Sequence, residues 1–117
     1  WVEPVVMRGT VAFRRSRISS LATDMGKWAD SGLVFADRAV ALDSRNAAAL
    51  ELRGTLRYWK WLNDLVADPK EGAELLRLAE VDLKEAVEAA KGEVRILKME
   101  GTSQPITDAS TNFVAGK

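Results

Sequence analysis

Cysteine and histidine are both absent from this chain of 117 residues. Without histidine the chain lacks the usual general base near neutral pH and the commonest zinc ligand. Without cysteine it can form no disulfide, and it offers neither a thiolate nucleophile nor a thiolate metal site. Since the sequence also contains no phosphate-binding glycine loop, we expect a protein that is not an enzyme and that carries no cofactor and no metal.

Net charge and long apolar runs are absent as well. The 17 Lys and Arg residues balance the 17 Asp and Glu residues, so no overall field attracts nucleic acid or an anionic membrane. No apolar run approaches the roughly 20 residues that cross a bilayer, and no signal-peptide pattern opens the chain. We therefore expect a cytoplasmic protein without nucleic-acid or membrane partners. The start at Trp1 indicates a fragment of a longer protein.

Apolar residues at helical spacing predict an all-α chain of four long helices and a short fifth one. The long helices are expected over residues 3–22, 28–42, 46–66 and 69–91, with a turn around Gly26 between the first two. The fifth is expected over residues 94–102, where a short strand is the alternative. The helical domain thus covers residues 1–102, and the Ser-, Thr- and Gly-rich residues 103–117 are expected to be a flexible tail or linker.

Two helix starts have specific signals. Asn46 is a good N-cap for the third helix. Asp68, Pro69 and Glu71 place a cap, a first-turn proline and an acidic residue at the start of the fourth, and Lys91-Gly92 is a typical stop. The third helix has apolar residues around roughly 200° of its circumference, which predicts a position in the middle of the domain.

Two further helices have one apolar stripe each. In the second helix the stripe is Trp28, Gly32, Phe35, Ala36, Ala39 and Val40. In the fourth it is Leu76, Ala79, Leu83, Ala86, Val87 and Ala90. The acidic residues of the fourth helix could be imagined as catalytic carboxylates, but their spacing from Lys84 is typical of a solvated face. They are Glu80, Asp82, Glu85 and Glu88.

An internal repeat is the strongest pattern in the sequence. Leu52-Arg53-Gly54-Thr55 corresponds to Met7-Arg8-Gly9-Thr10 and to Met99-Glu100-Gly101-Thr102, at spacings of 45 and 47 residues. Ala39 and Ala86 each lie fifteen residues before a repeated glycine. A mid-helix glycine costs roughly 1 kcal/mol, so a repeated one predicts a close helix crossing, with alanine on the partner helix.

The segment 36–54, ADRAVALDSRNAAALELRG, resembles the junction of two tetratricopeptide (TPR) repeats. Ala39 matches the late alanine of helix B, Leu50 the large apolar position of the next helix A, and Gly54 its small residue. Ser44 replaces the usual proline, and the period of 45–47 exceeds the family's 34. The resemblance covers residues 2–102 and implies antiparallel helix hairpins in a fragment of a right-handed solenoid. A HEAT-like repeat is the alternative.

In the TPR family, ligands lie along the concave face formed by helix A of each repeat. The resemblance puts Glu3, Val6, Thr10, Phe13, Arg14, Ala48, Glu51, Thr55, Tyr58, Trp59, Arg95, Lys98 and Thr102 on that face. Those expected to bind a partner are Phe13, Arg14, Glu51, Thr55, Tyr58, Trp59, Arg95 and Lys98.

Trp59 and Trp61 point in nearly opposite directions on a helix. The core is favoured for Trp61 and exposure for Trp59, which would then form an aromatic platform with Tyr58 and Phe13. The expected function is therefore a protein-interaction module that binds a peptide segment or a partner helix. The alternative is a structural or regulatory spacer of a signalling protein, without a ligand of its own. A truncated solenoid would expose an apolar end, so a homo-oligomer is also considered.

Overall fold

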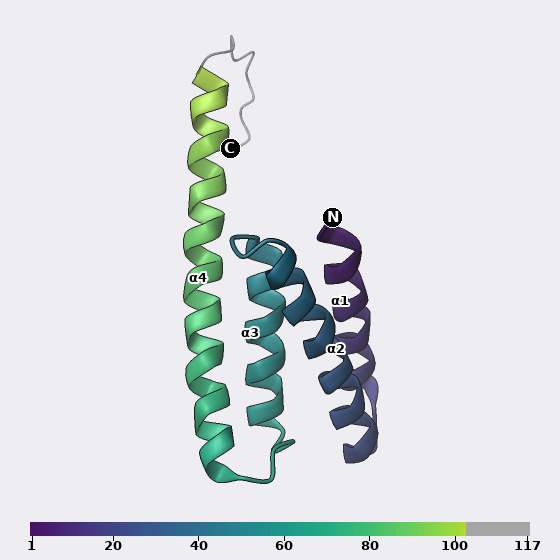
Figure 1. Ribbon diagram of the computed structural model, residues 1–117. Helices are drawn as coiled ribbons and strands as arrows, with labels where there is room; N and C mark the ends of the chain where they lie inside the picture. Colours follow the sequence, from purple (N-terminus) through teal and green to yellow (C-terminus); the bar gives the residue numbers. More distant parts are fainter. Residues whose placement is uncertain (103–117) are drawn as a thin grey trace.

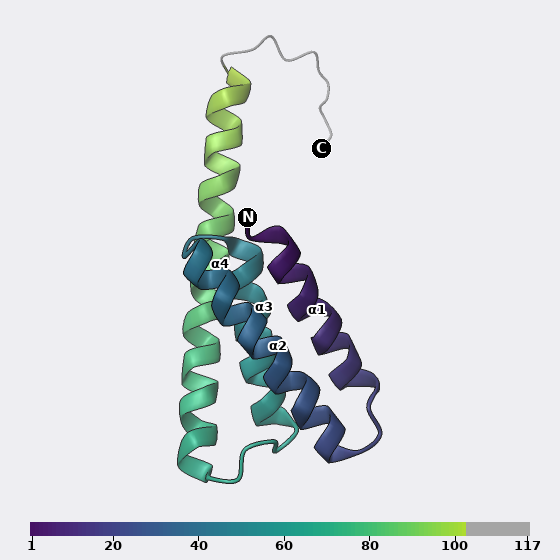
Figure 2. The same ribbon diagram turned by 45° about the vertical axis from the view of Figure 1, so that its right-hand side comes forward.

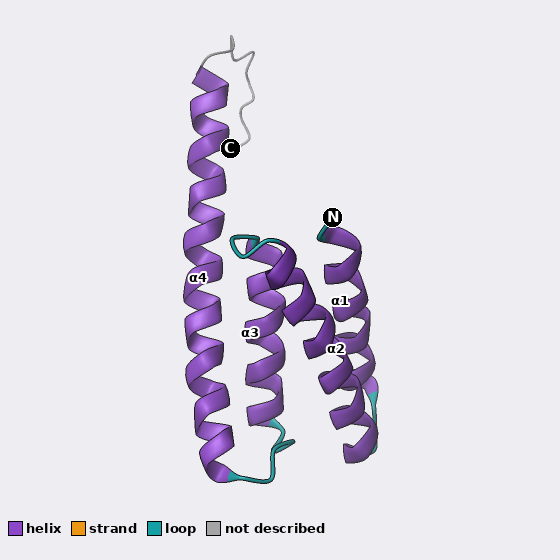
Figure 3. Ribbon diagram, in the orientation of Figure 1, coloured by secondary structure: helices purple, strands orange, loops and turns teal. Residues whose placement is uncertain are grey.

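The computed structural model describes the backbone of residues 1–102 and the side chains of residues 1–93. It contains four helices, α1 (Glu3–Ile18), α2 (Ala22–Leu42), α3 (Ala47–Leu62) and α4 (Pro69–Thr102) (Figures 1 and 3). The described residues include no strand, which confirms the predicted all-α class. The predicted tail, residues 103–117, lies outside the described residues.

Consecutive helices run antiparallel, so the chain forms the hairpins α1/α2 and α3/α4, with α2 beside α3 (Figures 1 and 2). The helix α3 packs against all three other helices. Its central position is the one predicted from its wide apolar surface. The C-terminal part of α4 extends beyond the other helices (Figure 1).

The two predicted helix starts are confirmed. The side-chain oxygen of Asn46 accepts a hydrogen bond of 2.9 Å from the backbone N–H of Ala49. The carboxylate of Asp68 accepts one of 3.0 Å from the N–H of Lys70, with Pro69 as the first residue of α4. Each cap satisfies an N–H group that the helix itself leaves free.

Two glycine signals predicted the wrong helix boundaries. Residues 23–27 lie inside α2, and the chain turns at residues 19–21 instead. Likewise α4 continues through Gly92 to Thr102, so residues 94–102 are its last turns and not a separate fifth helix or a strand. A Cβ added at Gly26 or Gly92 would have no neighbour within 4 Å, so no packing contact requires glycine there. An isolated glycine among good helix formers is tolerated at a cost of about 1 kcal/mol.

The third helix ends earlier than Val66, the predicted end. Its last residue is Leu62, and the Asn63 side chain donates to the carbonyl of Trp59 at 3.0 Å. Asp64 follows with φ at 57°, in the left-handed region that stops a helix and that Asp tolerates better than most residues.

Two of the three repeated glycines, Gly9 and Gly54, lie at helix crossings, as predicted; the surroundings of Gly101 lie outside the described side chains. A Cβ at Gly9 would lie 2.6 Å from Cδ2 of Leu52 and 3.3 Å from the backbone oxygen of Gly32. A Cβ at Gly54 would lie 2.9 Å from Cγ of Leu83 and 3.0 Å from Cβ of Asp82. These crossings therefore depend on the missing side chain.

The residues that face the glycines are not the predicted alanines. The nearest atoms to a Cβ at Gly9 also include Cβ of Phe35, at 3.3 Å, whereas Ala39 is buried elsewhere in α2. Ala86 packs with Leu50 and Ala89 in a separate core cluster. The second cluster joins Ala36 of α2 to Leu52 and Leu56 of α3. Small residues thus pack against large ones, but in a different register from the prediction.

The buried face of α2 agrees with its predicted stripe, whereas that of α4 is rotated. In α2, Gly32, Ala36 and Ala39 are buried. Among the described residues of α4, the buried ones are Ala79, Asp82, Ala86 and Ala89. Ala79 and Ala86 are buried as predicted, whereas Leu83 is 36% and Val87 54% exposed.

The prediction that Asp82 belongs to a solvated acidic face is wrong, because only 2% of it is exposed. Its carboxylate accepts two hydrogen bonds from Arg53, of 3.0 and 2.9 Å, and one of 2.6 Å from Arg57. The hydrogen bond with Asp82, followed by the negative charges of Asp82 and Asp37, raises the pKa of Arg53 above its ordinary value. Arg53 also lies 3.6 Å from Asp37 of α2. Two cations from α3 therefore compensate the burial of one carboxylate from α4.

We expect Gly54→Ala to lower the free energy of unfolding by about 1–3 kcal/mol, because the new methyl group would clash with Leu83 and Asp82. Gly26→Ala is the matched control: its methyl group meets nothing, so it should raise the free energy of unfolding by about 0.5–1 kcal/mol. Urea unfolding measures both. Stabilisation by both variants would contradict the close crossing at Gly54.

We expect Asp82→Asn to destabilise the chain by about 2–4 kcal/mol, because it keeps the shape but leaves Arg57 without an anion and Arg53 with only the more distant Asp37. Glu74→Gln is the control, since the pair of Glu74 and Arg77 is exposed and should matter little. Equal urea midpoints for the two variants would show that the buried ion pairs do not stabilise the fold.

Candidate binding face on α1 and α3

A hollow of about 650 Å³ lies between the first turns of α1 and α3, with one lining residue, Glu93, from α4. Its lining comes from Glu3, Val6, Met7, Asn46, Ala47, Ala48, Glu51 and Glu93. We call this the inner hollow. Four of these residues, Glu3, Val6, Ala48 and Glu51, belong to the face that the TPR resemblance implies.

The polar side chains of the inner hollow are mostly acidic. Glu3 of α1, Glu51 of α3 and Glu93 of α4 are exposed carboxylates on three different helices. Glu3 also accepts a 2.9 Å hydrogen bond from the indole N–H of Trp1. Among the described residues that line the hollow, none is lysine or arginine. The hollow therefore combines an apolar lining with an excess of negative charge.

Phe13 and Trp59 come together, but inside the interface between α1 and α3. Their rings form an edge-to-face pair with centroids 5.7 Å apart, and both are half-buried. The indole N–H of Trp59 donates to Oγ of Ser16 at 2.9 Å, and this hydroxyl donates to the carbonyl of Met25 at 2.7 Å. Ser16 is fully buried. This chain of hydrogen bonds connects α3 to α1 and α2.

Tyr58 and Trp61 form the second aromatic pair, with ring centroids 5.7 Å apart. Tyr58 is 42% exposed and Trp61 39% exposed. The structure thus divides the predicted platform in two. Of the two tryptophans of α3, Trp61 is the more accessible, and Trp59 is fixed by a tertiary hydrogen bond. This is the opposite of the assignment that the sequence favoured.

The other predicted binding residues are spread along the helices. Glu51 lines the inner hollow, Thr55 is half-buried, and Arg14 is exposed. Arg95 and Lys98 lie on α4, but their side chains are outside the described residues. The structure therefore brings Phe13 and Trp59 together in the interface between α1 and α3, whereas Glu51 lies apart from them, in the inner hollow.

Four residues of the hollow were missed from the sequence: Met7, Asn46, Ala47 and Glu93. Glu93 was missed because Lys91-Gly92 predicted a helix end just before it, whereas the continuous α4 carries Glu93 to the start of α3. The other three precede or adjoin residues that the TPR resemblance did indicate. Their position in the first turns of α1 and α3, next to those residues, is the sequence signal that points to them.

No group of three or more Asp or Glu side chains in the described part of the chain is arranged to hold a metal ion. Among the four helices, none has a stretch long and apolar enough to span a membrane.

Comparison with protein-family models, with curated proteins and with solved structures finds no match to this chain. The geometry described above therefore carries the functional argument.

We expect Trp59→Phe to lower the free energy of unfolding by about 1–2 kcal/mol, because it removes the hydrogen bond to the buried Ser16. Tyr58→Phe removes a hydroxyl from a neighbouring exposed ring and should change stability by less than about 0.5 kcal/mol. Both are measured by urea unfolding. If the two variants unfold at the same urea concentration, the bond to Ser16 contributes nothing in solution.

Proposed function

We propose that the chain is a protein-interaction module that binds a peptide segment of a partner along the α1/α3 face. The observation that supports this is the inner hollow of about 650 Å³, where carboxylates from three helices adjoin an apolar lining. Its volume lies in the range of pockets that accept small ligands or a few side chains. One or two side chains of the peptide would occupy the hollow while its backbone follows the face.

The chemistry of the hollow favours a segment that has a basic residue beside an apolar one. A Lys or Arg side chain can approach Glu3, Glu51 and Glu93, and its methylene groups can contact Val6 and Met7. Each exposed ion pair is worth about 0.2–1 kcal/mol. Three such pairs together correspond to roughly tenfold in affinity.

We also propose that the two hairpins are TPR-like repeats. In such repeats α1 and α3 would take the position of helix A, so this proposal supports binding on α1 and α3. The support is a shared register. Gly9 crosses α2 at Phe35 and Gly54 crosses α4 at Asp82, and these two crossings are offset by 45 residues on one helix and 47 on the other. The lack of histidine and cysteine supports a binding role and not an enzymatic one.

The test uses fluorescent peptides of the sequence Ala-Leu-Xaa-Leu-Ala in which Xaa is Arg, Gln or Glu, titrated against the purified chain. We expect the Arg peptide to bind about tenfold or more tightly than the Glu peptide, and its affinity to fall as salt is added. Glu51→Lys should remove this preference, because it replaces one carboxylate of the hollow by a cation.

Glu85→Lys is the matched control, since Glu85 is an exposed residue of α4 that does not line the hollow. It should keep the preference for Arg. Equal affinity for the three peptides, or the same loss in both variants, would contradict binding in the inner hollow and favour the role of a spacer without a ligand.

A further inference from the structure

A second groove, of about 400 Å³, lies on the side of α1 and α2 that α3 leaves uncovered. Its lining consists of Met7, Arg8, Val11, Ala12, Arg15, Trp28, Ser31 and Phe35, and we call it the outer groove. Met7 is 67% and Val11 46% exposed, so two large apolar side chains of α1 lie side by side in this groove in contact with solvent. An apolar groove of this kind is suited to a partner helix.

Cations border the outer groove. The guanidinium of Arg15 lies 4.7 Å from the ring centre of Trp28, and that of Arg38 lies 5.5 Å from the ring centre of Phe35. Arg8 is a third exposed cation of the lining. A guanidinium stacked on a ring keeps its N–H donors at the edge, where a carboxylate can accept them. The partner must therefore bring negative charge.

The internal register specifies the partner further. The α1 residues Met7, Arg8, Val11 and Arg15 stand 45 positions before Leu52, Arg53, Leu56 and Lys60 of α3. On α3, that set of four is the surface that α2 contacts. Leu52 and Leu56 cluster with Ala36 and Leu33 of α2.

Two ion pairs accompany this contact between α2 and α3. Nζ of Lys60 lies 2.6 Å from Asp30, and Nη1 of Arg53 lies 3.6 Å from Asp37. The two aspartates are seven residues apart on α2, as are Arg53 and Lys60 on α3. Arg8 and Arg15 of the outer groove keep both the charge and the spacing.

We propose that the outer groove binds an amphipathic helix of a partner protein that carries two carboxylates seven residues apart beside an apolar stripe. In this arrangement the carboxylates pair with Arg15 and Arg8, as Asp30 and Asp37 of α2 pair with Lys60 and Arg53. The apolar stripe covers Met7 and Val11, as Leu33 and Ala36 cover Leu52 and Leu56. The outer groove shares Met7 with the inner hollow, but none of its cations lines that hollow. Glu51→Lys on one side, and Arg8→Glu with Arg15→Glu on the other, therefore test the two proposals separately.

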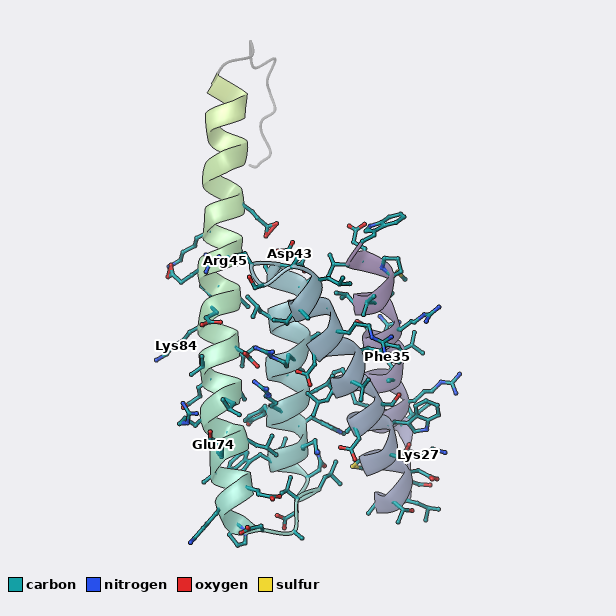
Figure 4. The ribbon with its side chains drawn as sticks, viewed as in Figure 1. Lys27, Phe35, Asp43, Arg45, Glu74 and Lys84 are labelled. Atoms are coloured by element: carbon teal, nitrogen blue, oxygen red, sulfur yellow. The ribbon has the colours of Figure 1, made fainter. Side chains whose placement is uncertain are left out.

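A second copy of this chain does not meet these requirements. The helix that corresponds to α2 is α4, and 47 positions after Asp30 and Asp37 it has Arg77 and Lys84. Stacked in the same register, α4 of another copy would place these cations against Arg15 and Arg8. Lys84 points away from α3 in the structure, on the side of α4 that such stacking would use (Figure 4). Like charges at both positions disfavour self-stacking.

The test attaches a second copy of α2, the helix that pairs with the corresponding residues of α3, to the N-terminus of α1. Residues 22–46 are duplicated in place of Trp1, so that the added helix precedes α1 with the turn that normally connects α2 to α3. If the outer groove takes such a helix, the melting temperature should rise by about 5 °C relative to the unmodified chain. Asp30→Lys and Asp37→Lys in the added copy alone should abolish the rise.

Charge exchange provides the decisive arm. Arg8→Glu with Arg15→Glu should abolish the rise caused by the native copy and restore it for the Lys-containing copy. Only a helix in the outer groove can respond in this way, because the original α2 pairs with Lys60 and Arg53. The control combines Arg45→Glu in the original segment, not in the added copy, with Lys70→Glu. It is an equal charge change at exposed residues outside the groove, and it should leave the rise unchanged. No rise, or equal rises for the native and Lys-containing copies, would overturn the proposal.

Light scattering of the unmodified chain tests the other occupant. We expect a monomer across a wide concentration range. Self-association that Arg8→Glu with Arg15→Glu abolishes would assign the groove to a second copy and overturn the assignment to a partner helix.

Discussion

The packing of α3 against the other three helices is the constraint on which the rest of the structure depends. A helix contacted on three sides needs close approaches, and these are possible because Gly9 and Gly32 carry no side chain next to Leu52 and Leu56, and Gly54 none next to Leu83 and Asp82. Close approach of the helices increases the dispersion contacts and the buried apolar surface of a small core, and a domain of this size needs both to be stable. It also makes these positions sensitive to a single methyl group.

The polar residues in the interior are acceptable because each has its partners. Asp82 is neutralised by two arginines of α3, and Ser16 both accepts from Trp59 and donates to Met25. No buried polar side-chain atom in the described part of the chain lacks a hydrogen-bond partner. Unpaired, each would cost about 1–3 kcal/mol or more. These contacts connect the helices in a defined register, whereas apolar contacts alone tolerate small shifts.

A neutral total charge hides two surfaces of opposite character. The inner hollow has three carboxylates, whereas the outer groove has Arg8 and Arg15. The helical periodicity places them apart, since neighbouring residues of α1 point in different directions: Val6 and Glu3 line only the inner hollow, and Val11 and Arg15 only the outer groove. Composition averages over such surfaces, so net charge alone says nothing of where a charged partner binds.

The sequence by itself determined the helical class, the central place of α3, the caps at Asn46 and Asp68, and the glycines at the crossings. These depend on local hydrogen bonds or on periodicity, which are written along the chain. Only the tertiary structure decided that Asp82 is buried, that Trp59 and not Trp61 is held by a hydrogen bond, that Glu93 joins the inner hollow, and that Gly26 and Gly92 lie within helices. The first three depend on which side chain of another helix lies opposite, and residues far apart in sequence supply that side chain. Gly26 and Gly92 have no such neighbour; they lie within helices because an isolated glycine among good helix formers is tolerated.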